Sequence, residues 1–495
     1  MNATGEPEGL IDAFWRYERA LMADDVAELD AIFAPGPQTV RADATGVLVG
    51  HDEIAAFRAR RGGAPRRTVL RVETRVVDED CAWVLAETAL AAGGRGLQSQ
   101  LWRRTDGHWH VHAAHVSGPP PAFDARTWRV VGDPLVRASG PGALSGERVA
   151  VKDLFAVAGQ PIGAGNPAWL AQASAEPVHA EAVGRLLAAG AEVAGISRTD
   201  EFAYSLAGVN AHYGSPANPA APGRLAGGSS SGSAAAVASG QASIGLGTDT
   251  GGSIRIPAAY TGLFGFRPSH GAVPMAGVMP LAPSFDTVGW LARDADTLRR
   301  VGRVLLTDAP PSAPARLVLP VALLDRASEE VRRAVRSAAE AWGAETVHWD
   351  LALLESWREV FVAHQAVEAW RSHGTWLAER MDTLGPDVRA RFAAAAERAD
   401  DGGAALALAR ERITDLVGDD VAVVPTAPTV APRLGDDLAA VREANLNLTC
   451  LAGLGGLPTA CVPTRIADSG LPCGVGLLAG RGRDHVLLDL AASLE

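Results

Sequence analysis

Serine and glycine are concentrated in one segment of the chain, residues 227–258. Four serines occur in its first seven residues, and a second glycine pair, Gly251 and Gly252, directly precedes Ser253. Glycine permits backbone conformations and close approaches that a side chain would forbid. Each pair can therefore gather backbone N–H groups around a serine hydroxyl, an arrangement that holds an oxyanion during acyl transfer. A flexible Gly/Ser loop is disfavoured, because apolar runs lie between the two pairs.

A second hydrolase motif overlaps this segment. Residues 228–232 fit G-x-S-x-G, the nucleophile elbow of α/β-hydrolases, with Ser230 as the central serine. Such an enzyme also needs a later acid and a histidine. The available histidines stand in no distinctive context: His270, His348, His364, His373 and His485. Phosphate-loop, H-E-x-x-H and metal-spaced His patterns are missing from the sequence, which therefore predicts no metal and no cofactor.

Residues 227–258 closely resemble the amidase signature, and the likeness to that family extends over about residues 122–494. Further matching segments follow in the family's order: 149–153, 199–203, 214–219, 280–289 and 452–463. The resemblance implies an α/β fold in which helices sandwich a mixed β-sheet. It also implies a serine amidohydrolase.

The same resemblance assigns roles to individual residues. It places the nucleophile at Ser253, a proton-relay serine with a cis peptide bond at Ser229, and the general base at Lys152. It places the oxyanion hole on four backbone amides: Thr250, Gly251, Gly252 and Ser253. Two positions depart from the common pattern, since Ser231 stands where many members have glycine and His179 where aspartate is common.

The surroundings of Lys152 agree with the role of a base. A lysine can accept a proton at neutral pH only if burial lowers its pKa, and Lys152 lies in the apolar stretch VAVKDLFAV. A surface lysine at a strand end is the alternative reading. Asp249 and Arg255 flank the nucleophile, and we assign them to holding its loop.

Residues 1–118 form a separate α+β region. Helical periodicity over residues 10–21, about 26–33 and about 53–61 precedes strand-like alternation, and Asp106-Gly107 predicts a tight hairpin. A Pro/Gly-rich stretch over 119–145 predicts a linker, and residues 146–495 the main domain. Serine at position 328 predicts the cap of a helix reaching Trp342.

The first region resembles the cone-shaped NTF2/SnoaL-like domains, and among them the decarboxylase of cyanuric acid degradation. The similar segments are 14–21, 39–41, 54–58, 98–102 and 112–117. That likeness implies decarboxylation of urea-1,3-dicarboxylate to allophanate, one step after an amidase-signature enzyme hydrolyses 1-carboxybiuret. Tyr17 and Arg41 are the site residues we expect, because arginine binds carboxylates bidentately and a phenol donates a hydrogen bond. Weaker candidates are Arg58, His112 and His115.

Two other functions remain open at this point: a general amidase whose first domain only dimerises, and a protein similar to the A subunit of tRNA-dependent amidotransferases. Charged residues make up 21% of the chain and the net charge is −12, which disfavours nucleic acid and anionic membranes as partners. The four scattered cysteines and the polar first ten residues favour reduced thiols and a cytoplasmic protein. We expect a small-molecule substrate and a homo-oligomer, with dimerisation through the first domain.

Overall fold

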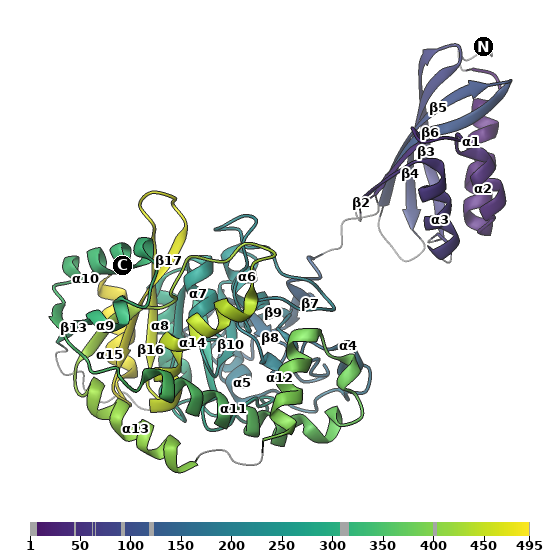
Figure 1. The fold of residues 1–495 in the computed structure, drawn as a ribbon. Coiled ribbons are helices and arrows are strands. Elements are labelled where there is room, and N and C mark those ends of the chain that lie inside the picture. The colour runs from purple at the N-terminus through teal and green to yellow at the C-terminus, as the bar shows by residue number, and fades with distance from the viewer. Residues whose placement is uncertain are drawn as a thin grey trace. The chain divides into compact units, whose positions relative to one another are not determined.

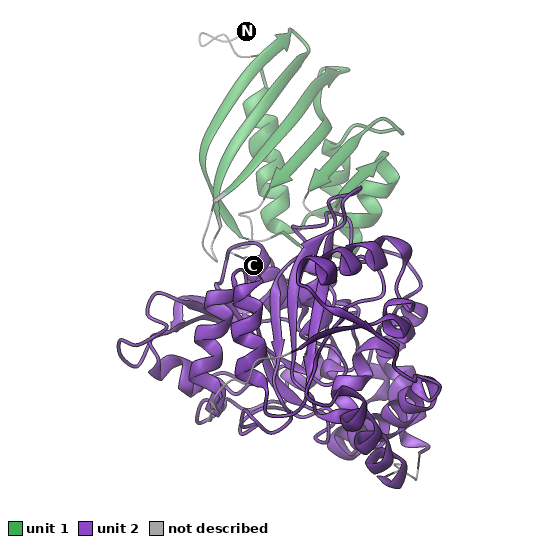
Figure 2. Ribbon diagram, turned by 90° about the vertical axis from the view of Figure 1, so that its left-hand side faces the viewer, with its two compact units in different colours: residues 1–122 green, residues 123–495 purple. Residues whose placement is uncertain are grey.

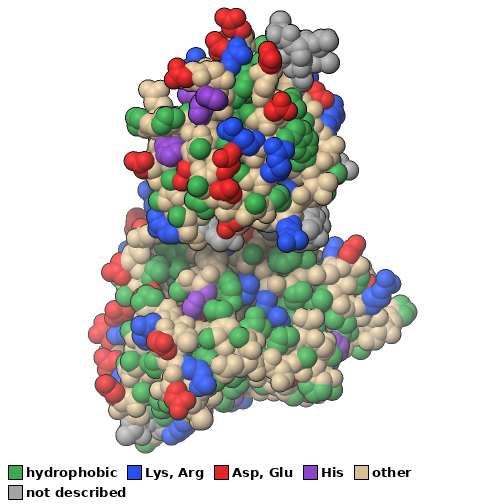
Figure 3. Space-filling view, turned by 90° about the vertical axis from the view of Figure 1, so that its right-hand side faces the viewer, with side chains coloured by type: hydrophobic (Ala, Val, Ile, Leu, Met, Phe, Trp, Pro, Cys, Tyr) green, Lys and Arg blue, Asp and Glu red, His purple; other side chains and the backbone are tan. Residues whose placement is uncertain are grey.

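The computed structural model divides the chain into two compact units, residues Met1–Ala122 and Phe123–Glu495 (Figure 2). It describes residues 7–43, 46–61, 63–64, 66–90, 95–117, 123–306, 316–398 and 403–494. Each unit has its own hydrophobic core. On the face shown in Figure 3, acidic and basic side chains are interspersed with hydrophobic ones.

The first unit is an α+β domain, as predicted. Its helices are α1 (Leu10–Ala23), α2 (Val26–Ile32) and α3 (His51–Arg61). Its strands are β1 (Val40–Asp43), β2 (Gly46–Val49), β3 (Arg67–Asp78), β4 (Cys81–Leu90), β5 (Arg95–Thr105) and β6 (His108–Ser117). In the described residues the strands form one sheet in the order β2-β1-β6-β5-β4-β3, in which only the β1–β6 pair is parallel.

The sheet of the first unit has one buried and one exposed face. Along β4 the side chains of Ala82, Val84 and Ala86 are buried against the helices, whereas Trp83 and Leu85 between them are exposed. Successive strand residues point to opposite faces, so this alternation identifies the face that the helices cover (Figure 1).

The predicted hairpin at Asp106-Gly107 is confirmed. Strands β5 and β6 pair antiparallel on either side of it. Asp106 and Gly107 have φ angles of 51° and 79°, the left-handed conformation that a two-residue hairpin turn requires. The turn therefore has the positive φ angles for which an Asp-Gly pair is suited.

The second unit is the mixed α/β domain that the sequence predicts. Its strands are β7 (Trp128–Val136), β8 (Arg148–Lys152), β9 (Glu192–Ser197), β10 (Ile244–Asp249), β11 (Phe264–Arg267), β12 (Thr287–Ala292), β13 (Leu317–Pro320), β14 (Glu345–Val347), β15 (Val421–Pro425), β16 (Thr459–Arg465) and β17 (Pro472–Ala479). In the described residues they form one sheet in the order β14-β13-β15-β17-β16-β11-β12-β10-β8-β9-β7.

Helices cover both faces of this sheet (Figure 1). They are α4 (Pro167–Leu170), α5 (Glu181–Ala188), α6 (Ser231–Ala238), α7 (Arg255–Thr261), α8 (Ala295–Leu305), α9 (Val321–Leu324), α10 (Glu329–Ala341), α11 (Leu354–Leu377), α12 (Pro386–Ala396), α13 (Gly403–Val417), α14 (Leu438–Gly455) and α15 (Asp484–Ser493). Neighbouring strand residues belong to different hydrophobic clusters: Val149 and Val151 pack in one, Ala150 in the other. Both faces are therefore buried, which explains why these strands read as continuous apolar runs.

The predicted linker over 119–145 is wrong in its central part. Strand β7 lies within that range and pairs antiparallel with β9 at the edge of the large sheet. The composition suggested a linker because of its Pro and Gly residues, but Trp128, Val130 and Val131 supply apolar contacts with the sheet. Pro134 falls where the β7–β9 register is interrupted, and there a missing N–H breaks no ladder bond.

Two further expectations can be compared with the structure. The helix expected from Ser328 exists as α10, but the Ser328 hydroxyl makes no capping hydrogen bond. All four cysteines are free and buried. Among the described residues, no helix combines the length and apolar character needed to cross a membrane.

Candidate active site

The residues singled out in the second unit meet at one edge of its sheet. Strands β8 and β10 are parallel neighbours, so their carboxyl ends lie together. Lys152 is the last residue of β8, and the loop that carries Ser253 follows β10. Helix α6 begins immediately after Ser229 and Ser230 and packs on both strands. Three separate segments of the sequence thereby converge on a single point.

Lys152 is fully buried and its ammonium nitrogen is surrounded by hydroxyl groups. Its Nζ lies 2.8 Å from Ser229 Oγ, 3.1 Å from Ser230 Oγ and 2.8 Å from Thr248 Oγ1. A protonated amine donates to all three, whereas a neutral amine donates to two and accepts from the third. The site can thus hold the lysine in either protonation state.

The environment of Lys152 changes its proton affinity. Burial lowers the pKa of Lys152 to about 7, against the opposing attraction of the carboxylates of Asp200, Asp249 and Asp286. A buried ammonium loses hydration that these more distant carboxylates replace only in part. An amine with this pKa exchanges a proton readily at neutral pH, which is what a general base requires.

The peptide bond between Gly228 and Ser229 is cis. The surrounding contacts hold this segment in place: Thr199 Oγ1 donates to the Ser229 carbonyl at 2.9 Å, and Ser230 N donates to the Ser253 carbonyl at 3.3 Å. The second contact ties the Ser229 segment to the loop of Ser253. Ser253 itself is 2% exposed. The Lys152 amine thus contacts Ser229 through its side chain, and a backbone hydrogen bond joins the next residue, Ser230, to Ser253.

The loop after β10 is organised around the carboxylate of Asp249. This carboxylate accepts hydrogen bonds from the backbone N–H groups of Gly252 (3.0 Å) and Ile254 (3.1 Å). The Arg255 guanidinium binds it with two nitrogens, and Arg267 Nη1 lies 2.9 Å away. All three charged side chains are buried. A buried carboxylate paired in this way fixes the loop, in agreement with the structural role expected for Asp249 and Arg255.

Electrostatics keep Asp249 ionised. Although burial raises the pKa of Asp249, the positive charges of Arg255 and Arg267 outweigh it and hold the pKa below its usual range. Burial has the opposite effect on a cationic group, and it lowers the pKa of Arg267 to about 10. Removal of Asp249 would leave two buried guanidinium groups without this counter-ion, which is strongly destabilising.

Four backbone amides were expected to form the oxyanion hole. One of them, the N–H of Gly252, is already bonded to Asp249. In the described chain, three N–H groups of the loop have no protein acceptor: Thr250, Gly251 and Ser253. Thr250 is held in turn by its hydroxyl, which donates to Asp286 at 2.6 Å.

The structure does not support Ser230 as the nucleophile of an α/β-hydrolase elbow. Its hydroxyl is fully buried, accepts from Lys152 and lies 3.3 Å from the Thr248 carbonyl. The histidines near the site have other partners: His373 bonds to the Pro280 carbonyl and His270 to the Pro283 carbonyl. The hydroxyls of Ser230 and Thr248 are hydrogen-bond partners of the Lys152 amine. The sequence did not predict this role for either residue.

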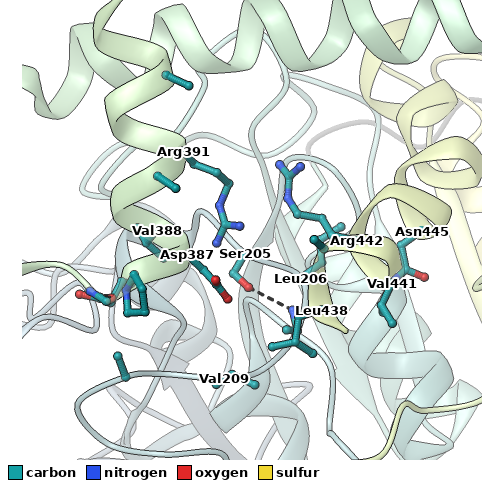
Figure 4. A pocket seen from close by; sticks show the side chains of 18 residues that line it. Ser205, Leu206, Val209, Asp387, Val388, Arg391, Leu438, Val441, Arg442 and Asn445 are labelled. Carbon is teal, nitrogen blue, oxygen red and sulfur yellow. Dashed lines mark hydrogen bonds between the residues drawn. The ribbon is translucent and has the colours of Figure 1, made fainter. Parts of the chain in front are cut away.

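A small cavity reaches Ser253 and adjoins a larger one, whose lining is shown in Figure 4. The small cavity is bordered by Thr250, Gly251 and Ser253. Both cavities share Ser205, Leu206 and Arg442 as walls, and the larger has a volume of about 430 Å³. The larger one lies mainly among α12, α14 and residues 201–211. The cavity at Ser253 itself is small, about 10 Å³, and the larger space lies next to it.

The first unit contains a cavity of its own, lined by both expected residues, Tyr17 and Arg41. Arg58 also borders it, and its Nη2 is buried with no hydrogen-bond partner in the described chain. Burial raises the pKa of Tyr17, against the nearby charge of Arg67, so the phenol stays protonated. The lining thus contains one hydroxyl donor and three guanidinium groups, each of which also pairs with a carboxylate of the protein.

Two weaker candidates of the first unit lie elsewhere. His112 and His115 do not line this cavity, and His115 borders the exposed face of the sheet instead. The register of β5 and β6 shifts between Leu101 and Trp102, which moves the later β6 residues relative to the simple alternation. Arg67 lines the cavity but was missed; its guanidinium binds the buried carboxylate of Glu18 at 2.8 Å.

No group of three or more His, Cys, Asp or Glu side chains among the described residues is arranged to hold a metal ion.

Comparison with known proteins identifies the second unit. The sequence model of the family described as Amidase matches residues 135–488. The chain belongs to the amidase family. It is 38% identical over 419 residues to Amidase 1 of Arabidopsis thaliana, an alignment that covers 75% of this chain and 98% of that protein. The protein is therefore an amidase-family hydrolase.

Solved structures agree with this assignment. A chain of the vestigial protein complex that reveals the evolutionary origins of an s-triazine catabolic enzyme superposes with a TM-score of 0.67 and 30% identity, covering 72% of this chain and 84% of that one. A solved amidase superposes with a TM-score of 0.65 and 34% identity over 71% of this chain and 85% of its own. The first unit of this amidase matches a second family, AtzH-like, over residues 8–120.

Proposed function

We propose that this amidase hydrolyses the terminal amide of 1-carboxybiuret, giving urea-1,3-dicarboxylate and ammonia, with Ser253 as nucleophile. The observation that carries the chemistry is the buried Lys152 amine, 2.8 Å from Ser229 Oγ and with a pKa lowered to about 7 by burial. The substrate is supported by the pairing of an AtzH-like domain with an amidase similar to a chain of the vestigial complex that reveals the origins of an s-triazine catabolic enzyme.

In the proposed mechanism Ser253 Oγ attacks the terminal carbamoyl carbon. Its proton passes to Ser229 Oγ, whose own proton moves to neutral Lys152. The N–H groups of Thr250, Gly251 and Ser253 stabilise the oxyanion. The C–N bond then breaks, and ammonia leaves with the proton returned through Ser229. Water, activated by the same pair, cleaves the acyl ester and restores the Ser253 hydroxyl.

We also assign decarboxylation of the product to the first unit. Urea-1,3-dicarboxylate would bind with its carboxylates at Arg41 and Arg58. The bond between one nitrogen and its carboxylate carbon would then break to release carbon dioxide. The nitrogen left behind takes a proton, which we assign to the Tyr17 hydroxyl of the cavity wall, and the resulting phenolate regains a proton from water. The product is allophanate.

The test follows freshly generated 13C-labelled 1-carboxybiuret by NMR, with ammonia measured in parallel. We expect one ammonia per substrate and passage through urea-1,3-dicarboxylate to allophanate, both faster than without enzyme. Accumulation of the dicarboxylate at its background decay rate would contradict the role of the first unit. Absence of ammonia above background would contradict the substrate assignment.

Substitution in the first unit should separate the two steps. In Tyr17→Phe and Arg41→Ala, decarboxylation of urea-1,3-dicarboxylate is expected to fall by about 10²-fold, the usual contribution of a positioned proton donor. Ammonia release should stay at the wild-type rate, because these residues belong to the other unit. Arg104→Ala, at the half-buried end of β5 where Arg104 pairs with Asp80 outside the cavity, is the control. Unchanged decarboxylation in both variants would favour a non-catalytic module.

A dimer through the first unit is a further part of the proposal. The uncovered face of its sheet exposes Trp83 (38%), Leu85 (44%) and Leu97 (60%) on adjacent strands, an apolar area typical of association surfaces. Light scattering after size-exclusion chromatography should give twice the mass of the chain. Leu85→Glu should give monomers, whereas Leu353→Glu, an exposed leucine of the second unit, should not. A wild-type monomer would rule the dimer out.

A further inference from the structure

The larger cavity beside Ser253 contains two guanidinium groups that the mechanism does not use. Arg391 projects from α12 and Arg442 from α14 into the same space, next to Ser205 and Asp387 (Figure 4). Both guanidinium groups lie near the aromatic ring of Tyr204, with their Cζ atoms 5.8 Å (Arg391) and 6.0 Å (Arg442) from the ring centroid. Two segments of the chain thus place two like charges in the lining of one cavity.

These charges are poorly compensated by the protein. In the described chain no carboxylate oxygen lies within 4.0 Å of either guanidinium, and the Nε atoms of both arginines are buried without a hydrogen-bond partner. The one polar contact of Arg442 is Nη2 to Gln365 Oε1, at 3.3 Å. Burial, together with the neighbouring charge of Arg391, lowers the pKa of Arg442 to about 10. Such an arrangement is unfavourable until an anion is bound.

The acidic residues of the cavity do not supply that anion. The carboxylate of Glu201 is occupied by Asn166, His212 and the backbone N–H of Gly385. Asp387 is exposed and attracts Arg391 only at a distance. The cavity therefore has two guanidinium groups without an ion-pair partner in the described chain, and Asp387, one helical turn from Arg391 on α12, as an exposed carboxylate beside them.

We propose that Arg391 and Arg442 bind a carboxylate carried by the amide substrate and restrict this enzyme to acidic amides. Arg442 borders both the larger cavity and the small one that reaches Ser253. A carboxylate held there leaves the other end of a short substrate directed toward the nucleophile. Arginine suits this task because its planar fork matches a carboxylate. The assignment rests on the proposed amidase chemistry and names its substrate class.

The test compares two stable amides that differ only in charge. Glutaramate has a carboxylate five carbon atoms along the chain from its amide carbon, counting both, and pentanamide has a methyl group in its place. Binding of each is measured by calorimetry to the full-length Ser253→Ala protein, so that the result does not depend on turnover. Glutaramate should bind at least tenfold more tightly than pentanamide.

Loss of either arginine should weaken glutaramate binding by roughly 10- to 100-fold, the range expected for a charge-assisted hydrogen bond. Arg391→Gln and Arg442→Gln, each in the Ser253→Ala background, should leave the weak binding of pentanamide unchanged. Arg389→Gln is the matched control, because Arg389 lies on the same helix but is exposed and bonds to the carbonyls of Asp382 and Leu384.

The outcomes separate this inference from the amidase proposal. With Ser253 intact, the arginine variants should raise KM for acidic amides far more than they lower kcat. Equal binding of the two amides, or equal losses for both amides in the variants, would overturn the carboxylate site. Tight, arginine-dependent binding of glutaramate without turnover of any amide by the wild type would instead preserve the site and contradict the proposed catalysis.

Discussion

Replacing Ser253 with alanine is expected to abolish amide hydrolysis, with kcat falling by roughly 10⁴-fold or more, as when a serine nucleophile is removed. The hydroxyl provides the atom that becomes acylated, and neither neighbouring serine can replace it. Ser229 and Ser230 are fully buried, and both contact Lys152. Ammonia release from 1-carboxybiuret, measured under single-turnover and steady-state conditions, provides the readout.

The control for this substitution is Ser239→Ala. Ser239 follows α6, and its hydroxyl bonds only to backbone carbonyls of that helix. Its removal should leave kcat within about twofold of the wild type, since exposed or half-buried polar contacts of this kind contribute little free energy. Substantial activity remaining in Ser253→Ala would mean that another residue is acylated.

Replacing Lys152 with methionine is expected to lower kcat/KM by roughly 10³-fold, within the usual range for a general base. The wild-type enzyme should also show a characteristic pH dependence. Only the neutral amine accepts a proton, so kcat/KM should rise with pH up to about 7, the value to which burial lowers the pKa of Lys152, and level off above it. In Lys152→Met that rise should disappear.

The same substitution should not destabilise the fold. The pKa of Lys152 is lower in the folded protein than in the unfolded chain, so the folded state binds fewer protons between about pH 7 and the pKa of a free lysine. The free energy of unfolding is therefore reduced, most strongly below pH 7, and this reduction fades as the pH rises. Methionine carries no such penalty, and Lys152→Met should unfold at a temperature no lower than the wild type at pH 6. A large fall in Tm would indicate a structural role for the ammonium group.

Much of the second unit could be predicted because its chemistry is local in sequence. The serines and the glycine pair lie within residues 227–258, and Lys152 stands at the end of an apolar strand. The partners of these residues could not be predicted in the same way. Thr248 and Asp249 end the apolar strand β10, and only the parallel pairing of β8 with β10 brings that strand end to Lys152.

Other parts of the account depend on packing between distant segments. Arg391 and Arg442 come from two helices separated along the chain, and nothing in their local sequence distinguishes them from surface arginines. In the first unit the ion pair of Glu18 and Arg67 joins the first helix to the third strand. The sequence predicts a linker where strand β7 lies, because the proline and glycine content of residues 119–145 hides the apolar residues that pack on the sheet.

Covalent labelling would establish which serine is the nucleophile. A fluorophosphonate forms a stable bond to an activated serine oxygen with loss of fluoride, and peptide mass spectrometry then locates the modified residue. We expect a single adduct on Ser253, absent from Ser253→Ala and formed much more slowly in Lys152→Met. An adduct on Ser230 or Ser229, or labelling that persists in Ser253→Ala, would contradict the assignment of Ser253 as the acylated residue.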